Sequence, residues 1–223
     1  MSQDRPNILL ITSDQQHYST LGVRNPKIKT PALDRLCGEG MRFTRAYCNN
    51  PTCTPSRATL ITGMYPSWHG AWSLGTKLAE DVPTVGERFR EAGYATQLIG
   101  KAHFQPLRSA PDQPSIECQP TLRDLDFWRE FQGPWYGFEH IELTRNHVDE
   151  SHAGQHYAIW MEEKGLANWR DYFGDCSDGH DRPAGYRGAW DLPEQYHYTA
   201  WTGERTCANI EQAVGEGRPF FTW

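Results

Sequence analysis

The chain has 223 residues, a formal net charge of −6 at pH 7 and a hydrophobic content of 38%. Its length suits one large domain or part of a larger protein. Its apolar residues, which include nine tryptophans, are enough for a core and argue against wholesale disorder. The negative charge argues against nucleic-acid binding by bulk attraction, but it leaves room for a small anionic substrate at a locally positive site.

The sequence predicts neither a leader peptide nor a membrane span. The apolar run at residues 8–11 is short for a signal peptide, and Asp4 precedes it. No segment approaches the roughly 20 apolar residues that a membrane helix needs. We therefore expect a cytoplasmic protein with no membrane or nucleic-acid partner. The six cysteines are irregularly spaced and contain no CxxC pair, which argues against a disulfide framework and a structural zinc site.

The first elements along the chain predict a strand, a helix and a second strand. Residues 7–13 read NILLITS, a short apolar run typical of a buried strand. The strand leads to Asp14, which would lie at the carboxyl edge where open α/β sheets bind ligands; a helix N-cap is the alternative role. A helix follows Thr30-Pro31 and stops at a glycine. Residues 41–47 are predicted as another strand.

The next elements continue this alternation. Residues 55–61 predict a helix that begins just after Cys53. Thr84 and Glu87 form a capping box that opens a further helix, and residues 94–99 predict a buried strand. Alternating strands and helices predict an α/β fold with a mixed, mostly parallel sheet flanked by helices.

The remainder of the chain has a weaker pattern. Residues 105–202 show no clear period, and we expect an elaborated insertion within the same domain, held in order by its aromatic residues. Residues 203–223 return to the sheet through a helix at 205–214 and a strand at 218–223. Because the chain stops inside this apolar strand, we expect it to be truncated, with residues 1–104 forming the N-terminal part of its domain.

Cys53 has a setting that the other cysteines lack. Pro55 favours an extended backbone at Thr54, and the N–H groups at the start of the following helix would face an anion near Cys53. Arg57 adds a fixed positive charge one turn into the helix. The residues alone leave open a small buried cysteine beside a helix cap and a nucleophilic thiolate.

Four segments in order resemble the sulfatase family across most of residues 6–104. The stretch from Cys53 to Gly63, CTPSRATLITG, resembles the family motif C-x-P-S-R-x-x-x-x-T-G. PNILLITSDQQ resembles the family's N-terminal strand and its metal-binding aspartate, and KTPALDRLCGEGMRFTRAY matches the stretch between these motifs. GYATQLIGKAHF resembles G-Y-x-T-x-x-x-G-K-W-H, with Ala102 in place of tryptophan. The resemblance implies an alkaline phosphatase-like fold and a sulfuric ester hydrolase.

The resemblance also implies a metal site and a modified nucleophile. Asp14, Gln15 and Cys53 would ligate a divalent cation, calcium in most of the family, with manganese or magnesium as alternatives. Many sulfatases have a second aspartate at the position of Gln15, whereas choline-sulfatase-like and phosphonate-monoesterase-like members share the Asp-Gln pair. Cys53 would be oxidised to formylglycine by a formylglycine-generating enzyme.

The formylglycine hydrate is a geminal diol whose hydroxyl would attack sulfur. Its second hydroxyl can then lose a proton and expel sulfate by C–O cleavage, which a cysteine or a simple alcohol cannot do. Arg57 would steady the ionised diol, and Lys101 and His103 would bind the anionic oxygens or the leaving-group side. His69 is interpreted as mainly structural.

These inferences predict a metal-dependent hydrolase of a small organic sulfate ester. A phosphonate monoester or phosphodiester hydrolase on the same scaffold is the nearest alternative. A catalytically inactive binding protein and a thiol enzyme that uses unmodified Cys53 are the others. The later metal ligands, the catalytic histidine and the further lysine of the family have no match in this chain, and the oligomeric state is not predicted.

Overall fold

The computed structural model describes residues 5–145, 153–173 and 191–223. The chain divides into two compact units, one made of residues 1–10 with 49–223 and the other of residues 11–48. Within the described ranges no helix combines the length and the apolar character that crossing a membrane requires.

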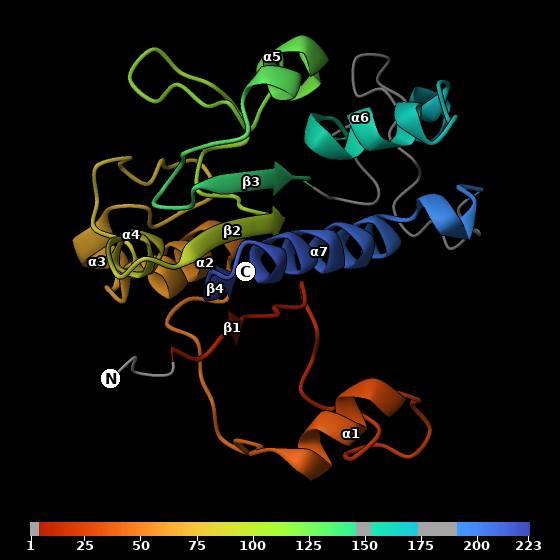
Figure 1. Cartoon of the computed structure of the whole chain (residues 1–223). Helices are drawn as coiled ribbons and strands as arrows, with labels where there is room; N and C mark the ends of the chain where they lie inside the picture. Colours follow the sequence, from red (N-terminus) through yellow and green to blue (C-terminus); the bar gives the residue numbers. More distant parts are fainter. Residues whose placement is uncertain (1–4, 146–152, 174–190) are drawn as a thin grey trace. The chain divides into compact units, whose positions relative to one another are not determined.

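The larger unit is built on a parallel four-stranded sheet. Its strands are β1 (Ile8–Leu9), β2 (Ala95–Gly100), β3 (His140–Leu143) and β4 (Phe220–Thr222), in the order β1-β4-β2-β3 (Figure 1). All three strand pairs are parallel. The prediction of a mostly parallel sheet flanked by helices is therefore confirmed, and the carboxyl ends of the strands share one edge.

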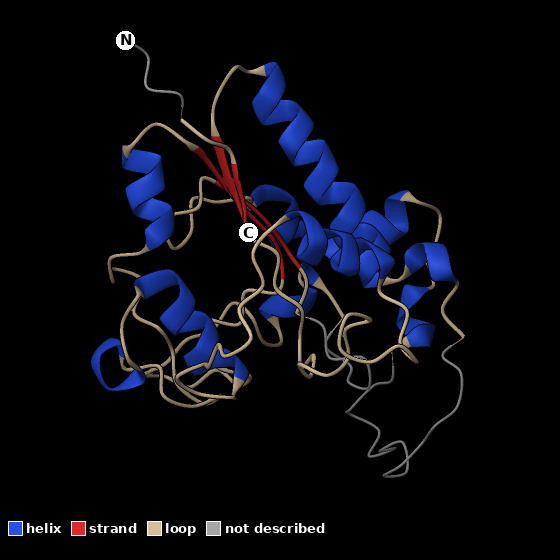
Figure 2. Cartoon of the chain, turned by 90° about the horizontal axis from the view of Figure 1, so that it is seen from below, coloured by secondary structure: helices blue, strands red, loops and turns tan. Residues whose placement is uncertain are grey.

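Helices cover both faces of this sheet. The long α7 (Tyr198–Gly215) runs beside the strands in Figures 1 and 2, and its Ala213 packs with Ala95 of β2 and Phe220 of β4. Neighbouring side chains of a strand point to opposite faces, so Phe221 faces away from α7. Its ring stacks 4.6 Å from that of Phe89 in α4 (Val85–Glu91). The Thr84 half of the predicted capping box opens α4, because the Thr84 hydroxyl accepts the Glu87 N–H at 3.1 Å.

The remaining elements of the larger unit surround a core rich in aromatic side chains. Trp128, Trp169 and Trp201 are fully buried in it. Most of the aromatic core therefore comes from the stretch that the sequence left without a clear period. The elements are α2 (Cys53–Thr62), α3 (Pro66–His69), η1 (Thr121–Arg123), α5 (Leu125–Glu130), α6 (Gln155–Glu163), η2 (Trp169–Tyr172) and η4 (Glu194–Tyr196).

The smaller unit holds α1 (Pro31–Glu39), at the predicted position. The strand predicted at residues 41–47 is wrong, because the structure has no strand there. A strand needs a neighbouring backbone to pair with, and the alternation of apolar and charged residues in this stretch is not matched by such a neighbour.

Three other expectations need correction. Residues 105–202 were expected to hold little regular structure, yet they contain β3, α5 and α6, and β3 pairs with β2. The first strand covers Ile8–Leu9 rather than residues 7–13. The last helix begins at Tyr198, earlier than predicted. The division of the domain at residues 104 and 202 stays a prediction.

Candidate active site

The carboxyl ends of three parallel strands bring basic and aromatic residues to one edge of the sheet. Lys101 follows β2, Arg145 lies two residues beyond β3, and Trp223 follows β4. In open α/β sheets this edge is where ligands bind. The edge is therefore the place to look for the residues that the motifs single out.

Cys53 is the first residue of α2, so the helix begins two residues earlier than the sequence predicted. Thr52 precedes it with an extended backbone, and its N–H donates to the Asn50 side-chain oxygen at 2.8 Å. Pro55 lies in the first turn, where its missing N–H costs no helical bond. The half-buried Cys53 side chain thus stands at the end of the helix where the dipole is positive.

The structure brings three of the four predicted catalytic residues together. The Lys101 ammonium nitrogen lies 3.6 Å from the Cys53 sulfur. Arg57 is 8% exposed, donates a hydrogen bond to the Lys101 carbonyl oxygen, and places its guanidinium 5.7 Å from the centre of the Trp223 ring. One positive charge therefore lies beside the side chain of residue 53, and a second, held by a backbone carbonyl and an aromatic face, is bonded to the residue that supplies it.

His103 is the fourth predicted residue, and it lies in a different environment. Its side chain is fully buried, and its Nε2 is 3.4 Å from Nη2 of Arg145. Its backbone has a φ of 55°, in the left-handed region that is uncommon for a residue other than glycine. The role of His103 toward anionic oxygens or a leaving group stays a prediction.

Two buried charged residues near His103 were missed by the sequence analysis. Glu117 and Arg145 are each 1% exposed, and the Glu117 carboxylate accepts the backbone N–H of His103 at 2.7 Å. Recognising β3 would have placed Arg145 at the carboxyl edge by the rule for parallel sheets. Glu117 comes from an irregular segment, so no periodicity could have indicated it.

Asp14 and Gln15 lie in the smaller unit, so their approach to Cys53 stays a prediction. They offer one carboxylate and one amide oxygen, ligands of the kind that Ca²⁺ prefers, but Ca²⁺ takes six to eight oxygen ligands. Among the residues that the structure describes, no group of three or more His, Cys, Asp or Glu could hold a metal ion. These residues therefore suit calcium in kind but do not by themselves form a site for it.

His69 has a structural setting, as the sequence analysis expected. Its Nδ1 accepts the Ala71 N–H at 3.1 Å, and its Nε2 lies 3.2 Å from the Thr59 hydroxyl of α2. Burial lowers the pKa of His69. The neutral ring thus ties α3 to α2, on the helix that begins at Cys53.

The fold and this edge define a class: an α/β protein with a parallel sheet, a candidate nucleophile at the start of a helix and a cation beside it. The sulfatase family model matches residues 6–149, which is more than half of the chain. The chain therefore belongs to the sulfatase family.

Curated relatives agree with this assignment. An arylsulfatase of Clostridium perfringens is 31% identical over 97% of this chain and 42% of its own length. An uncharacterized sulfatase of Escherichia coli, YidJ, is 34% identical over 68% of this chain and 33% of its own length. The chain thus spans about a third to two fifths of these relatives.

Solved structures share the fold. A phosphonate monoester hydrolase from Silicibacter pomeroyi has a TM-score of 0.65 and 24% identity, over 98% of this chain and 40% of that one. The PsFucS1 sulfatase from Pseudoalteromonas has a TM-score of 0.59 and 24% identity, over 97% and 42%. At this identity the likeness speaks for the architecture and not for a substrate.

Proposed function

We propose that this chain carries the nucleophile of a sulfate ester hydrolase, and that the nucleophile is a formylglycine derived from Cys53. The observation that carries the proposal is the 3.6 Å approach of the Lys101 ammonium to the Cys53 sulfur, inside a family motif and at the start of α2. A helix N-terminus and two cations favour negative charge at that point. Both an ionised nucleophile and a sulfate ester are negatively charged.

The residues around position 53 have distinct parts in the proposed reaction. The hydrated aldehyde supplies a hydroxyl nucleophile where unmodified Cys53 has its sulfur. Lys101 stabilises negative charge on that nucleophile and on the ester oxygens, because its ammonium already lies beside the side chain. Arg57 acts as a fixed charge behind the nucleophile, since its hydrogen bond to the Lys101 carbonyl and its stacking on Trp223 hold it in place.

The proposal includes dependence on a divalent cation, calcium before manganese or magnesium, with Asp14 and Gln15 among its ligands. The described residues do not by themselves complete a calcium site, so further ligands are part of the proposal. A small organic sulfate is the proposed substrate, a formylglycine-generating enzyme is the partner that modifies Cys53, and the cytoplasm is the proposed compartment.

Peptide mass spectrometry tests the nucleophile directly. The peptide that contains residue 53 should be about 18 Da lighter than the cysteine form when the protein is co-expressed with a formylglycine-generating enzyme. Cys207, an exposed free cysteine of the same chain, provides the matched control because it should keep its full mass. A peptide that stays unmodified under co-expression contradicts the formylglycine proposal and favours a thiol enzyme or an inactive binding protein.

A phosphonate monoester hydrolase is the second candidate, because Gln15 weakens the choice of a sulfate over it. Asp-Gln stands here where many sulfatases have two aspartates, and both choline-sulfatase-like and phosphonate-monoesterase-like members share that pair. Turnover of an aryl sulfate and an aryl phosphonate by the intact protein should separate the two functions. A higher kcat/KM for the sulfate is expected, and a preference for the phosphonate would overturn the sulfatase assignment.

A further inference from the structure

A buried carboxylate holds the loop that carries Lys101. Glu117 accepts three consecutive backbone N–H groups, from His103 at 2.7 Å and from Phe104 and Gln105 at 2.8 and 2.9 Å. Successive N–H groups that converge on one anion form a concave anion site of the kind known as a nest. Here the occupant is a side chain of the same molecule, so the loop after β2 is folded around it.

The charge of Glu117 is enclosed and balanced within the protein. The side chain is 1% exposed. Burial raises the pKa of Glu117, whereas the positive charge of Arg145 and the three N–H bonds act in the opposite direction. An enclosed carboxylate is costly unless it is compensated, and here three N–H bonds and the attraction of the Arg145 charge compensate it.

The loop that Glu117 holds has an unusual backbone at His103, where φ is 55°. It is also fixed on its far side, because the Phe104 carbonyl accepts the Leu78 N–H at 2.8 Å. Lys101 lies only two residues before His103, and it presents its ammonium to Cys53 and its carbonyl to Arg57. The conformation of one short loop therefore sets three of the predicted catalytic side chains relative to each other.

We propose that Glu117, balanced by Arg145, is a positioning residue that holds the loop of residues 101–105 so that the Lys101 ammonium stays beside the side chain of residue 53. The structural part of this inference stands on contacts within the larger unit. Its catalytic consequence rests on the proposed function.

The test measures the reactivity of unmodified Cys53 in the intact protein produced without a formylglycine-generating enzyme. The Lys101 ammonium and the Cys53 sulfur are in direct contact, so the alkylation rate of this sulfur reports on that contact. In Glu117→Gln the side-chain NH₂ replaces one acceptor of backbone N–H groups and the negative charge is lost. Lys101 should then leave the sulfur, and alkylation of Cys53 by iodoacetamide at neutral pH should slow about tenfold, read on the Cys53 peptide by mass spectrometry.

Three further variants make the result specific. Lys101→Met sets the rate without the ammonium, and combining it with Glu117→Gln should slow the reaction no further, because both changes act through one contact. Glu142→Gln is the matched control, since it also alters a buried carboxylate but one that bonds to α7, and it should leave the Cys53 rate unchanged. Glu117→Asp keeps the charge with a shorter reach and should give an intermediate rate.

The possible outcomes are decisive in both directions. An unchanged or faster rate in a folded Glu117→Gln variant overturns the inference, and so does an equal slowing in Glu142→Gln. If Glu117→Gln does not fold, Glu117→Asp decides by the same rates. In the modified, active protein Glu117→Gln should lower kcat about ten- to a hundredfold with KM changed less than about threefold. Because alkylation needs no turnover, failure of the sulfatase proposal would leave the positioning result intact.

Discussion

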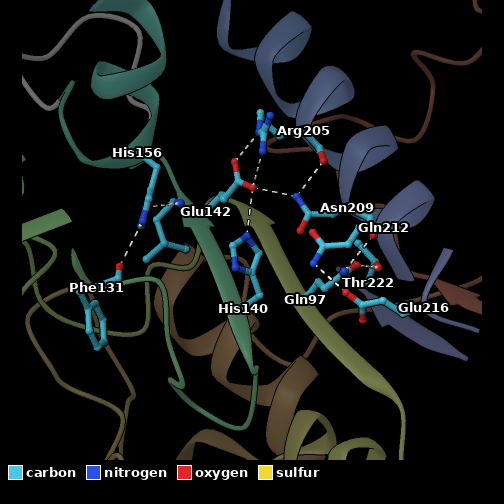
Figure 3. A network of polar contacts seen from close by, with 11 residues as sticks. Gln97, Phe131, His140, Glu142, His156, Arg205, Asn209, Gln212, Glu216 and Thr222 are labelled. Carbon is cyan, nitrogen blue, oxygen red and sulfur yellow. Dashed lines mark hydrogen bonds and ion pairs between the residues drawn. The ribbon is translucent and has the colours of Figure 1, made fainter. Parts of the chain in front are cut away.

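Two polar clusters lie on the same sheet and differ in how their charges are balanced. One is the candidate active site at the carboxyl edge. The other, here called the α7 network, joins the sheet to α7 and centres on Glu142 of β3 (Figure 3). Both bury carboxylates and cations, so burial alone does not tell a reactive cluster from a structural one.

The α7 network is a continuous set of hydrogen bonds around one carboxylate. Arg205 holds Glu142 with two bonds, at 2.6 and 3.1 Å, and Asn209 donates to the same carboxylate at 2.7 Å. Gln97 continues the chain, donating to the Asn209 carbonyl at 3.0 Å and accepting from Thr222 at 2.6 Å. Side chains of β2, β3 and β4 are thereby tied to each other and to α7 (Figure 3).

The electrostatics of the α7 network match a structural role. Burial by itself raises the pKa of Glu142, but hydrogen bonds from His140, Arg205 and Asn209 outweigh it and lower that pKa to about 2. The carboxylate is therefore ionised, and its principal cation is a bidentate arginine. Such a cluster has its charges matched and its bonds in place without a ligand.

The candidate site has a different balance. Its described members include the cations of Arg57, Lys101 and Arg145, whereas Glu117 is the carboxylate among them. These charges gather where strands end and a helix begins, and a surplus of positive charge at such a point suits an anionic ligand. We therefore expect substitutions at the carboxyl edge of the sheet to affect turnover, and substitutions in the α7 network to affect stability.

The largest effect is expected from removing the nucleophile. Cys53→Ala should lower kcat/KM for an aryl sulfate by about a thousandfold or more, because no side chain at that position can then be modified or attack. Steady-state kinetics on the intact, modified protein measure this. Thermal unfolding serves as the control, since the half-buried side chain should change the midpoint little. Substantial turnover by Cys53→Ala would show that residue 53 is not the nucleophile.

Replacing the neighbouring cation should have the next largest effect. Lys101→Met keeps the apolar length of the side chain and loses the charge 3.6 Å from the sulfur of residue 53. A loss of about a hundred- to a thousandfold in kcat is expected, as for other groups that stabilise charge in a transition state. Lys164→Met is the matched control, because the Lys164 ammonium pairs with Glu204 of α7 at 3.2 Å, and this change should leave kcat unchanged.

Local signals explain how much of the fold the sequence predicts. The apolar run at residues 94–99, the capping box at Thr84 and the glycine that stops α1 each act within a few residues, and each predicted its element. The strand predicted at 41–47 failed because a strand depends on a partner that local pattern does not show. β3 was missed for a related reason, since its strand is short and lies between segments without a period.

The candidate site follows the same division. Cys53, Arg57 and Lys101 were found because they lie in contiguous motifs, and the structure brings them together. Glu117 and Arg145 lie 14 and 42 residues from His103 in the sequence, so only the folded chain brings them to it. Residues that act through distant contacts leave no local pattern to read.

The α7 network supplies the opposite test. Glu142→Gln removes the charge from a carboxylate that Arg205 and Asn209 hold, and it should lower the free energy of unfolding by about 3 kcal/mol at neutral pH. Urea unfolding measures the change. The specific activity of the folded fraction should stay within about twofold of the wild type. A large loss of kcat would show that the α7 network also serves turnover.

The smallest effect concerns acid stability and His156, which joins β3 to Phe131 (Figure 3). Its Nδ1 accepts the Leu143 N–H at 3.0 Å and its Nε2 lies 3.2 Å from the Phe131 carbonyl. Burial lowers the pKa of His156 to about 4 from an ordinary value of 6.5. Between pH 6.5 and about 4 the unfolded chain therefore binds a proton on this histidine that the folded chain does not bind. As a result, stability that is present above pH 6.5 is lost as the pH falls toward 4.

This loss should reach about 2 kcal/mol by about pH 5, and urea unfolding across that range measures it. His156→Gln offers an amide with a donor and an acceptor but no titrating ring, so its stability should fall less over the same range. Glu142 is ionised in both states over most of this range, and by pH 5 the partial protonation of the unfolded carboxyl adds only about 0.2 kcal/mol. If the free energies of unfolding of the two proteins fall in parallel with pH, His156 takes up its proton within the folded chain. The predicted acid sensitivity beside the α7 network would then be wrong.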